Sequence, residues 1–151
     1  MPSSMVLSLE GVHYFLDAHH VGVFEGTLSH AGVSGRVVGV QVGGAWTDGT
    51  GSAENAVCVD GRISQINEDL AWEYDRGDWM APWRITASDS GRVDLVLTPF
   101  HVRTDRTNLG LLANDTHQAF GTWSGTMVDD DGDVIRCDGV RGWAEEVVNR
   151  W

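Results

Sequence analysis

The sequence predicts a single all-β domain over residues 1–151, an antiparallel barrel or sandwich of about nine strands with a short C-terminal helix. Short segments in which apolar and polar residues alternate recur along the whole chain, and turn residues separate them. The chain also holds 19 glycines but only three prolines. Many short strands with turn signals about every eight to twelve residues are typical of β-sandwiches and barrels, and a chain of this length forms one domain by default.

Alternation in the first half of the chain defines five expected strands. The clearest segment places Val38, Val40 and Val42 on one face. Asp60-Gly61 separates two apolar segments and predicts a type I′ hairpin turn, because both central residues of that turn need a positive φ. The expected strands span residues 12–17, 21–29, 36–42, 56–59 and 62–66.

The second half continues the pattern until the last ten residues. Hairpin turns are expected at residues 88–91 (Ser-Asp-Ser-Gly) and 129–132 (Asp-Asp-Asp-Gly). Trp143, Val147 and Trp151 recur every four residues, which predicts a short amphipathic helix docked by its two tryptophans. The expected strands span residues 70–76, 83–87, 92–100, 109–113, 118–128 and 134–140.

Charge and composition exclude several classes of function. The net charge is −12, and the ten basic residues are all arginines without any basic cluster, so neither nucleic acid nor an anionic membrane surface is an expected partner. No apolar run approaches the roughly 18 residues of a membrane-spanning helix, and the first residues lack the pattern of a signal peptide. We therefore expect a cytoplasmic protein, in which Cys58 and Cys137 are small buried hydrophobes.

The segment from residue 72 to 84 is the densest in aromatic and charged side chains. Trp72, Tyr74, Trp79 and Trp83 all fall within it. One interpretation is a pocket mouth with aromatic walls for an apolar ligand, where Asp75 or the nearby Asp78 orients a polar group. The alternative is a purely structural turn, in which arginines pair with carboxylates above packed rings.

A second polar group comprises Asp48, Glu54 and Asn55, in a glycine-rich loop that enters a strand. A carboxylate held near apolar walls has a raised pKa and can act as a general acid. The alternative is a turn whose side chains cap backbone amides.

Histidines supply a third set of candidates. His117 could serve as a base or proton shuttle, with Gln118, Arg103 and Trp123 as further ligand-binding candidates. The alternative for His117 is a hydrogen-bonded structural residue. We expect no metal and no cofactor, because the histidines lack ligand spacing, residues 129–133 lack the oxygen spacing of a calcium loop, and no nucleotide-binding motif is present.

Several segments together carry a family resemblance. They are His13-Tyr14-Phe15, Thr47-Asp48-Gly49, Glu54-Asn55, Val59-Asp60-Gly61-Arg62-Ile63, Glu73-Tyr74-Asp75, Pro82-Trp83-Arg84, Val93-Asp94-Leu95, Thr98-Pro99-Phe100, Arg103, His117-Gln118, Phe120-Gly121 and Ser124-Gly125-Thr126. In this order the chain resembles a bacterial family catalogued as a domain of unknown function (family 2804). The resemblance implies a lipocalin-like β-architecture, similar to that of carotenoid 1,2-hydratase-type proteins, without implying a reaction. It also implies a match to the C-terminal half of longer members, so that this half either folds alone or pairs as a homodimer.

Three functional hypotheses follow. The first is an enzyme that performs acid/base chemistry on an apolar small molecule, as a hydratase, isomerase or cyclase; here Asp48, Glu54 and Asp75 act as acid or base, and His117 assists. The second is a non-catalytic carrier of such a ligand, and the third is a structural half-domain completed by dimerisation. Convergence of the acid/base residues on one cavity would favour the first hypothesis.

Overall fold

The computed structural model of the protein describes residues 17–30, 33–44, 55–109 and 113–150, with side chains at 37–43, 55–109 and 113–148. Within these residues every regular element is a β-strand, which confirms the all-β prediction. No helix there could cross a membrane. The ten strands are β1 (Asp17–His30), β2 (Val33–Gly44), β3 (Asn55–Val59), β4 (Arg62–Ile66), β5 (Ala71–Glu73), β6 (Trp83–Thr86), β7 (Val93–Asn108), β8 (Ala113–Val128), β9 (Val134–Arg136) and β10 (Val140–Arg150).

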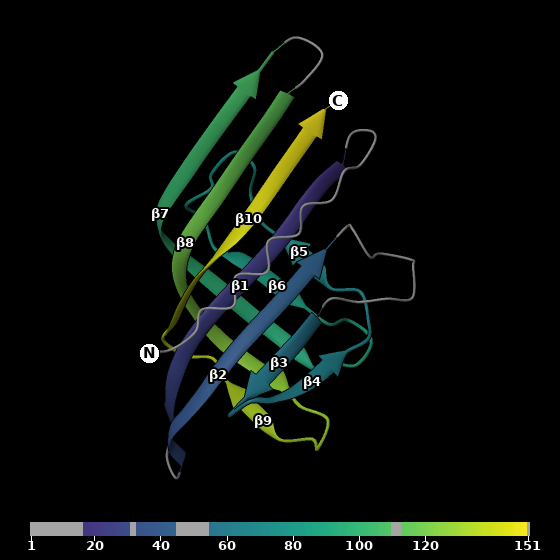
Figure 1. The fold of residues 1–151 in the computed structure, drawn as a ribbon, viewed down its shortest axis with the longest axis vertical. Helices are drawn as coiled ribbons and strands as arrows, with labels where there is room; N and C mark the ends of the chain where they lie inside the picture. The colour runs from purple at the N-terminus through teal and green to yellow at the C-terminus, as the bar shows by residue number, and fades with distance from the viewer. Residues whose placement is uncertain (1–16, 31–32, 45–54, 110–112, 151) are drawn as a thin grey trace.

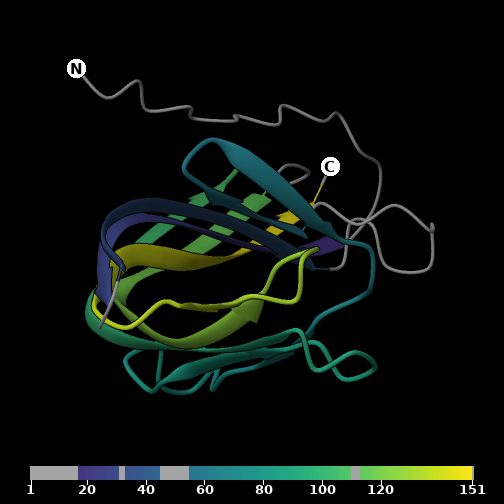
Figure 2. The ribbon, with the colours of Figure 1, turned by 90° about the horizontal axis from the view of Figure 1, so that it is seen from below.

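All ten strands belong to one antiparallel sheet that folds over itself. The strand order is β4-β3-β2-β1-β10-β8-β7-β6-β5, with β9 paired to the far end of β8. The lower parts of β7 and β8 pass behind β1 to β3 together with β5 and β6 (Figure 1), and the two layers are seen end-on in Figure 2. The described strands end at β4 and β5 without pairing those two. The architecture is therefore sandwich-like and is not a closed barrel.

The fold-over occurs where β7 and β8 bend together. The register between them shifts between Pro99 and His101, as in a β-bulge. On β8, Gly125 has a φ of +109°, and a Cβ there would lie 2.1 Å from the carbonyl oxygen of Asp94. A Cβ on Gly121 would lie 2.4 Å from the carbonyl oxygen of Thr98. Two glycines on β8 thus let the backbone of β7 come close enough for the sheet to turn.

The core lies between the two layers and is built from alternate residues of the strands. Val38, Val40 and Val42 on β2 are buried, as predicted. Trp83 on β6 and Trp123 on β8 are the largest fully buried side chains. They fill the centre of the space between the layers, and the half-buried Trp72, Tyr74, Trp79 and Val102 pack around this core.

The predicted hairpin turns are present. Asp60 and Gly61 between β3 and β4 have φ values of 51° and 87°, as a type I′ turn requires. Residues 88–90 turn between β6 and β7. In the acidic turn after β8, the Asp129 carboxylate accepts hydrogen bonds from the amides of Asp131 (3.0 Å) and Asp133 (2.9 Å).

The prediction of a C-terminal helix is wrong, because residues 140–150 form β10 between β1 and β8. Ala144 and Glu146 face the interior and are buried, whereas Trp143 and Glu145, which alternate with them, are only half-buried. Burial therefore follows a period of two. The backbone of a central strand forms hydrogen bonds with a neighbouring strand on each side. These bonds outweigh the weak tendency of nine residues to form a helix.

Several expected strands have different limits in the structure. Of the expected strand over 109–113, Leu109 follows the end of β7 at Asn108 and Ala113 begins β8, and the residues between them lie outside the described part of the chain. The expected strand over 134–140 is divided by a turn at Gly139, whose φ is +83°. Most of the expected strand over 12–17 lies outside the described residues.

Both cysteines are free thiols. Cys137 is buried in the core, and this burial raises the pKa of its thiol to about 12. Cys58 is half-buried.

Candidate functional site

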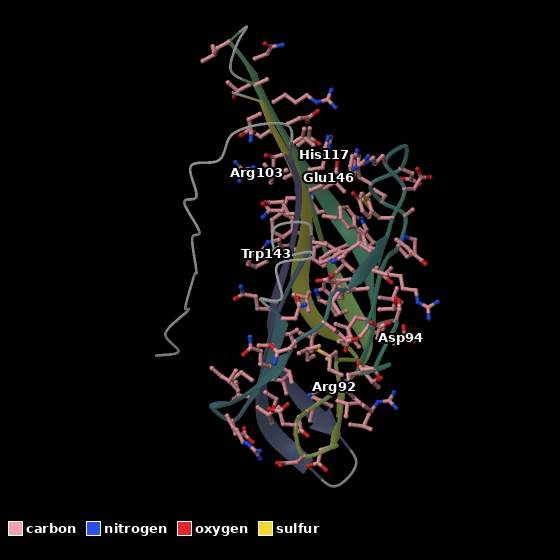
Figure 3. The ribbon with its side chains drawn as sticks, turned by 90° about the vertical axis from the view of Figure 1, so that its right-hand side faces the viewer. Arg92, Asp94, Arg103, His117, Trp143 and Glu146 are labelled. Carbon is pink, nitrogen blue, oxygen red and sulfur yellow. The ribbon has the colours of Figure 1, made fainter. Side chains whose placement is uncertain are left out.

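Two polar side chains are buried on the inner face near the upper end of the core. His117 on β8 and Glu146 on β10 are directly opposite one another in the antiparallel register, and each is less than a tenth exposed. Figure 3 shows both on one side of the sheet, with Arg103 and Trp143 on the other side. A buried histidine beside a buried carboxylate at the edge of an apolar core is the centre of the candidate site.

The connection between β5 and β6 supplies the partners of Glu146. Its carboxylate accepts hydrogen bonds from the Tyr74 hydroxyl and from Arg76 Nε, the latter at 3.0 Å. Arg76 Nη2 also lies 3.4 Å from the Tyr74 oxygen. The Glu146 side chain is 5% exposed and that of Arg76 is 64% exposed, so a solvated cation compensates a carboxylate that is removed from water.

These contacts alter the acidity of Tyr74. Burial raises the pKa of Tyr74 to about 12, and the hydrogen bond and charge of Glu146 act in the same direction. The hydrogen bond that Arg76 donates to Glu146 raises the pKa of Arg76. Because the pKa of Tyr74 in the folded state exceeds its ordinary value of 10.0, its contribution to stability is complete below pH 10 and is lost as the pH rises towards 12.

The Glu146→Gln variant is expected to lower the pKa of Tyr74 while leaving it above its ordinary value. The substitution removes the carboxylate charge, whereas burial, the larger cause of the shift, remains. Alkaline titration of tyrosinate absorbance in a Tyr14→Phe background measures this, since the chain has two tyrosines. Glu145→Gln on the outer face is the matched control and should leave the titration unchanged; equal shifts in both variants would contradict the assignment.

An aromatic stack joins the core to His117. The rings of Tyr74 and Trp83 are stacked at 4.2 Å and 9°. The ring of Trp79 is stacked on the imidazole of His117 at 4.0 Å and 10°, and Trp79 and Trp83 lie 5.8 Å apart. The imidazole of His117 therefore packs face to face on the indole of Trp79.

Two carboxylates accept backbone hydrogen bonds in the loop that carries Trp79. Asp75 Oδ1 accepts a hydrogen bond from the Gly77 amide at 2.7 Å, and Asp78 Oδ1 accepts one from the Met80 amide at 3.0 Å. The loop is tied to the core because Trp83 Nε1 lies 3.4 Å from the Trp79 carbonyl oxygen. Exposed Asp75 and Asp78 therefore cap turns in the loop.

His117 is held at both ring nitrogens. Nδ1 lies 3.2 Å from Thr104 Oγ1 on β7, and Nε2 lies 3.1 Å from Asp115 Oδ1. The same Asp115 oxygen accepts a hydrogen bond from Arg106 Nε at 2.9 Å. An imidazole between a hydroxyl and a carboxylate has a fixed orientation, and it can take up or release a proton at Nδ1 while Asp115 balances the charge.

The other predicted site residues lie apart from this group. Asn55 is buried and joins two segments, since its side chain accepts a hydrogen bond from the Gly43 amide at 2.8 Å and donates one to the Glu68 carbonyl at 2.9 Å. Trp123 is fully buried in the core, and Trp72 packs against that core.

Two further candidates are on the opposite, outer face. Arg103 and Gln118 are register partners there, and Arg103 is exposed with an ion pair of 3.8 Å to Asp105. Asp48 and Glu54 lie outside the described residues. The structure thus brings together Tyr74, Trp79, Trp83 and His117 from the predicted set.

Four residues of the site were not predicted from the sequence: Thr104, Asp115, Glu146 and Arg76. Three of them come from β7, β8 and β10, where only the strand register reveals their proximity. The signal that was available is the alternation of Ala144, Glu146 and Val148, which indicates a strand with Glu146 on its apolar face. Among the described side chains, no three His, Cys, Asp or Glu residues form a metal-binding group.

The fold and site define an all-β, sandwich-like protein with a buried His–Glu pair at the end of its core. The chain belongs to the family described as a domain of unknown function, DUF2804, whose model matches residues 18–151. Neither a curated protein nor a solved structure matches the chain.

Proposed function

We propose that this protein binds an apolar small molecule that carries one polar group, and that it exchanges a proton with this ligand as a lipocalin-like hydratase, isomerase or cyclase in the cytoplasm. The observation that carries the proposal is the register pair of His117 and Glu146, buried where the apolar core ends. A ligand with an apolar body and a polar end fits such a boundary. Asp48 and Glu54 keep their predicted acid/base role in this proposal.

The hydrogen bonds around His117 support a role as general base. If Nε2 donates to Asp115, the neutral ring accepts at Nδ1, the atom that lies 3.2 Å from Thr104 Oγ1. Because Thr104 is exposed, a ligand hydroxyl or acidic C–H can replace it beside Nδ1. Arg76 is a donor for the oxygen on which negative charge develops. The single hydroxyl proton of Tyr74 is donated to Glu146, and Tyr74 keeps it because its pKa is about 12.

A non-catalytic carrier is the second candidate. It is favoured by the contacts that already engage both ring nitrogens of His117 and the Glu146 carboxylate within the protein. Binding then needs no proton transfer, and the stacked rings of Tyr74, Trp79 and Trp83 form an apolar wall.

Ligand binding is tested with 8-anilino-1-naphthalenesulfonate, a fluorescent probe that combines apolar rings with an anionic group. We expect saturable binding at one site, weakened about tenfold by Arg76→Ala through loss of a charge-assisted contact. Arg84→Ala is the matched control, since Arg84 is a half-exposed arginine paired with Asp94 on the outer face. Equal affinity of the two variants, or no saturable binding to the folded protein, would overturn the proposal.

Native mass spectrometry of protein purified from its own host begins the experiment that distinguishes an enzyme from a non-catalytic carrier. The recovered ligand is incubated with fresh protein and with the His117→Gln variant. A hydratase adds or removes one water, and an isomerase or cyclase changes the retention time without changing the mass. Conversion that needs His117 supports the enzyme, and an unchanged ligand supports the carrier.

A further inference from the structure

Among the described strands, the upper half of β7 forms an edge of the sheet. The register between β6 and β7 ends at Leu97, whereas β7 continues to Asn108 with β8 as its only partner among the described strands. Figure 1 shows β7 at the margin of the sheet there. Every residue from Arg103 to Asn108 is exposed. The free edge of a long strand is a template for pairing with another strand.

The charges along this edge are complementary to themselves. Arg103 and Asp105 flank Thr104 and are 66% and 59% exposed at their side chains. If two copies of the edge pair antiparallel with Thr104 opposite Thr104, each Arg103 lies opposite the partner's Asp105. Charged residues usually protect an edge strand from pairing, but at this register they attract, because unlike charges meet twice.

The same register covers exposed apolar side chains at both ends of the edge. Phe100 is 60% exposed and Leu109 is 73% exposed, which makes Leu109 the most exposed large hydrophobic residue described. Antiparallel pairing about Thr104 brings the end of one edge at Phe100, beside the bulge after Pro99, to the opposite end of the other edge at the partner's Leu109. Each Phe100 and Leu109 can therefore pack across the two ends of the seam.

We propose that this protein is a homodimer in which two β7 edges pair antiparallel about Thr104 and join the two sheets into one. Three observations carry the proposal independently of the ligand site: the open edge, the self-complementary charges and the exposed apolar ends. The inner faces of both copies become continuous across the twofold axis. Because neighbouring strands are about 4.8 Å apart, the two β8 strands that carry His117 lie about 14 Å from one another.

The test is sedimentation velocity on the full chain over a wide micromolar range, at a salt concentration that screens repulsion between two chains of net charge −12. The wild-type chain should dimerise. Arg103→Asp and Asp105→Arg should each raise the dissociation constant about tenfold or more, because like charges then meet twice. The double variant with both substitutions restores the unlike pairs and should dimerise like the wild type.

Arg136→Asp is the matched control. Arg136 is about half-exposed and pairs with Asp138 two residues away. It lies on β9 beside the lower end of β8, so the substitution makes the same local charge change away from the upper half of β7. It should leave the dissociation constant unchanged, and circular dichroism confirms that each variant is folded. A monomeric wild-type chain, a dimer unaffected by Arg103→Asp, or a double variant that stays weak would each overturn the proposal.

Discussion

Replacement of Gly125 by alanine is expected to lower the free energy of unfolding by more than about 3 kcal/mol. Gly125 has a φ of +109°, a backbone conformation that other residues rarely adopt. An added Cβ would also lie 2.1 Å from the Asp94 carbonyl oxygen on β7, so the two central strands of the fold-over would have to separate. Urea unfolding followed by tryptophan fluorescence measures the loss.

The matched control is Gly39→Ala in β2. The nearest heavy atom to a Cβ at Gly39 is Cys58 Cβ at 3.9 Å, an ordinary contact, and its φ is outside the left-handed region. Alanine there should change the free energy of unfolding by less than about 1 kcal/mol. Comparable losses in both variants would show that the bend does not depend on the backbone of Gly125.

The sequence predicted those parts of the fold that local patterns determine. Asp60-Gly61 specifies its own hairpin because the turn needs only the conformations of two adjacent residues. The buried face of Val38, Val40 and Val42 follows from the side-chain period of a strand. Neither feature requires knowledge of a distant residue.

The C-terminal helix was predicted because the relevant spacing is ambiguous. Trp143 and Val147 are four residues apart, and residues four apart share a face in a strand as well as in a helix. The burial of Glu146, two residues from Ala144, decides between the two. From the sequence alone a glutamate is expected on the exposed face, because its burial requires hydrogen-bond partners. The partners of Glu146 lie 70 and 72 residues away in the sequence, so its burial could not be foreseen.

Part of the candidate site could likewise be predicted from the sequence, and part could not. Tyr74, Trp79 and Trp83 could be predicted because they are neighbours in the sequence. The contact of His117 with Thr104 depends on the β7–β8 register, which in turn depends on the bulge after Pro99. A shift of one residue would place Thr104 on the outer face, so no local pattern could specify this contact.

Trp83→Ala is expected to lower the free energy of unfolding by about 3–5 kcal/mol, because it leaves a cavity in the centre of the core. Trp83 is fully buried and belongs to the largest core side chains. The comparison is Trp143→Ala on the outer face, where the ring is half-buried; its loss should cost less than half as much, since the site can fill with water. Chemical denaturation of both variants measures the difference, and equal losses would contradict this account of the core.

The Trp83→Phe variant tests whether Trp83 stabilises the core alone or also positions the side chains of the candidate site. Phenylalanine keeps most of the apolar volume but removes the Nε1 donor that lies 3.4 Å from the Trp79 carbonyl, and it shortens the surface on which Tyr74 stacks. We expect a loss of only about 1–2 kcal/mol, together with a change in the NMR resonances of His117, because Trp79 positions that ring. If the His117 resonances remain unchanged while stability falls, the stack supports the core alone and the position of His117 depends on Thr104 and Asp115.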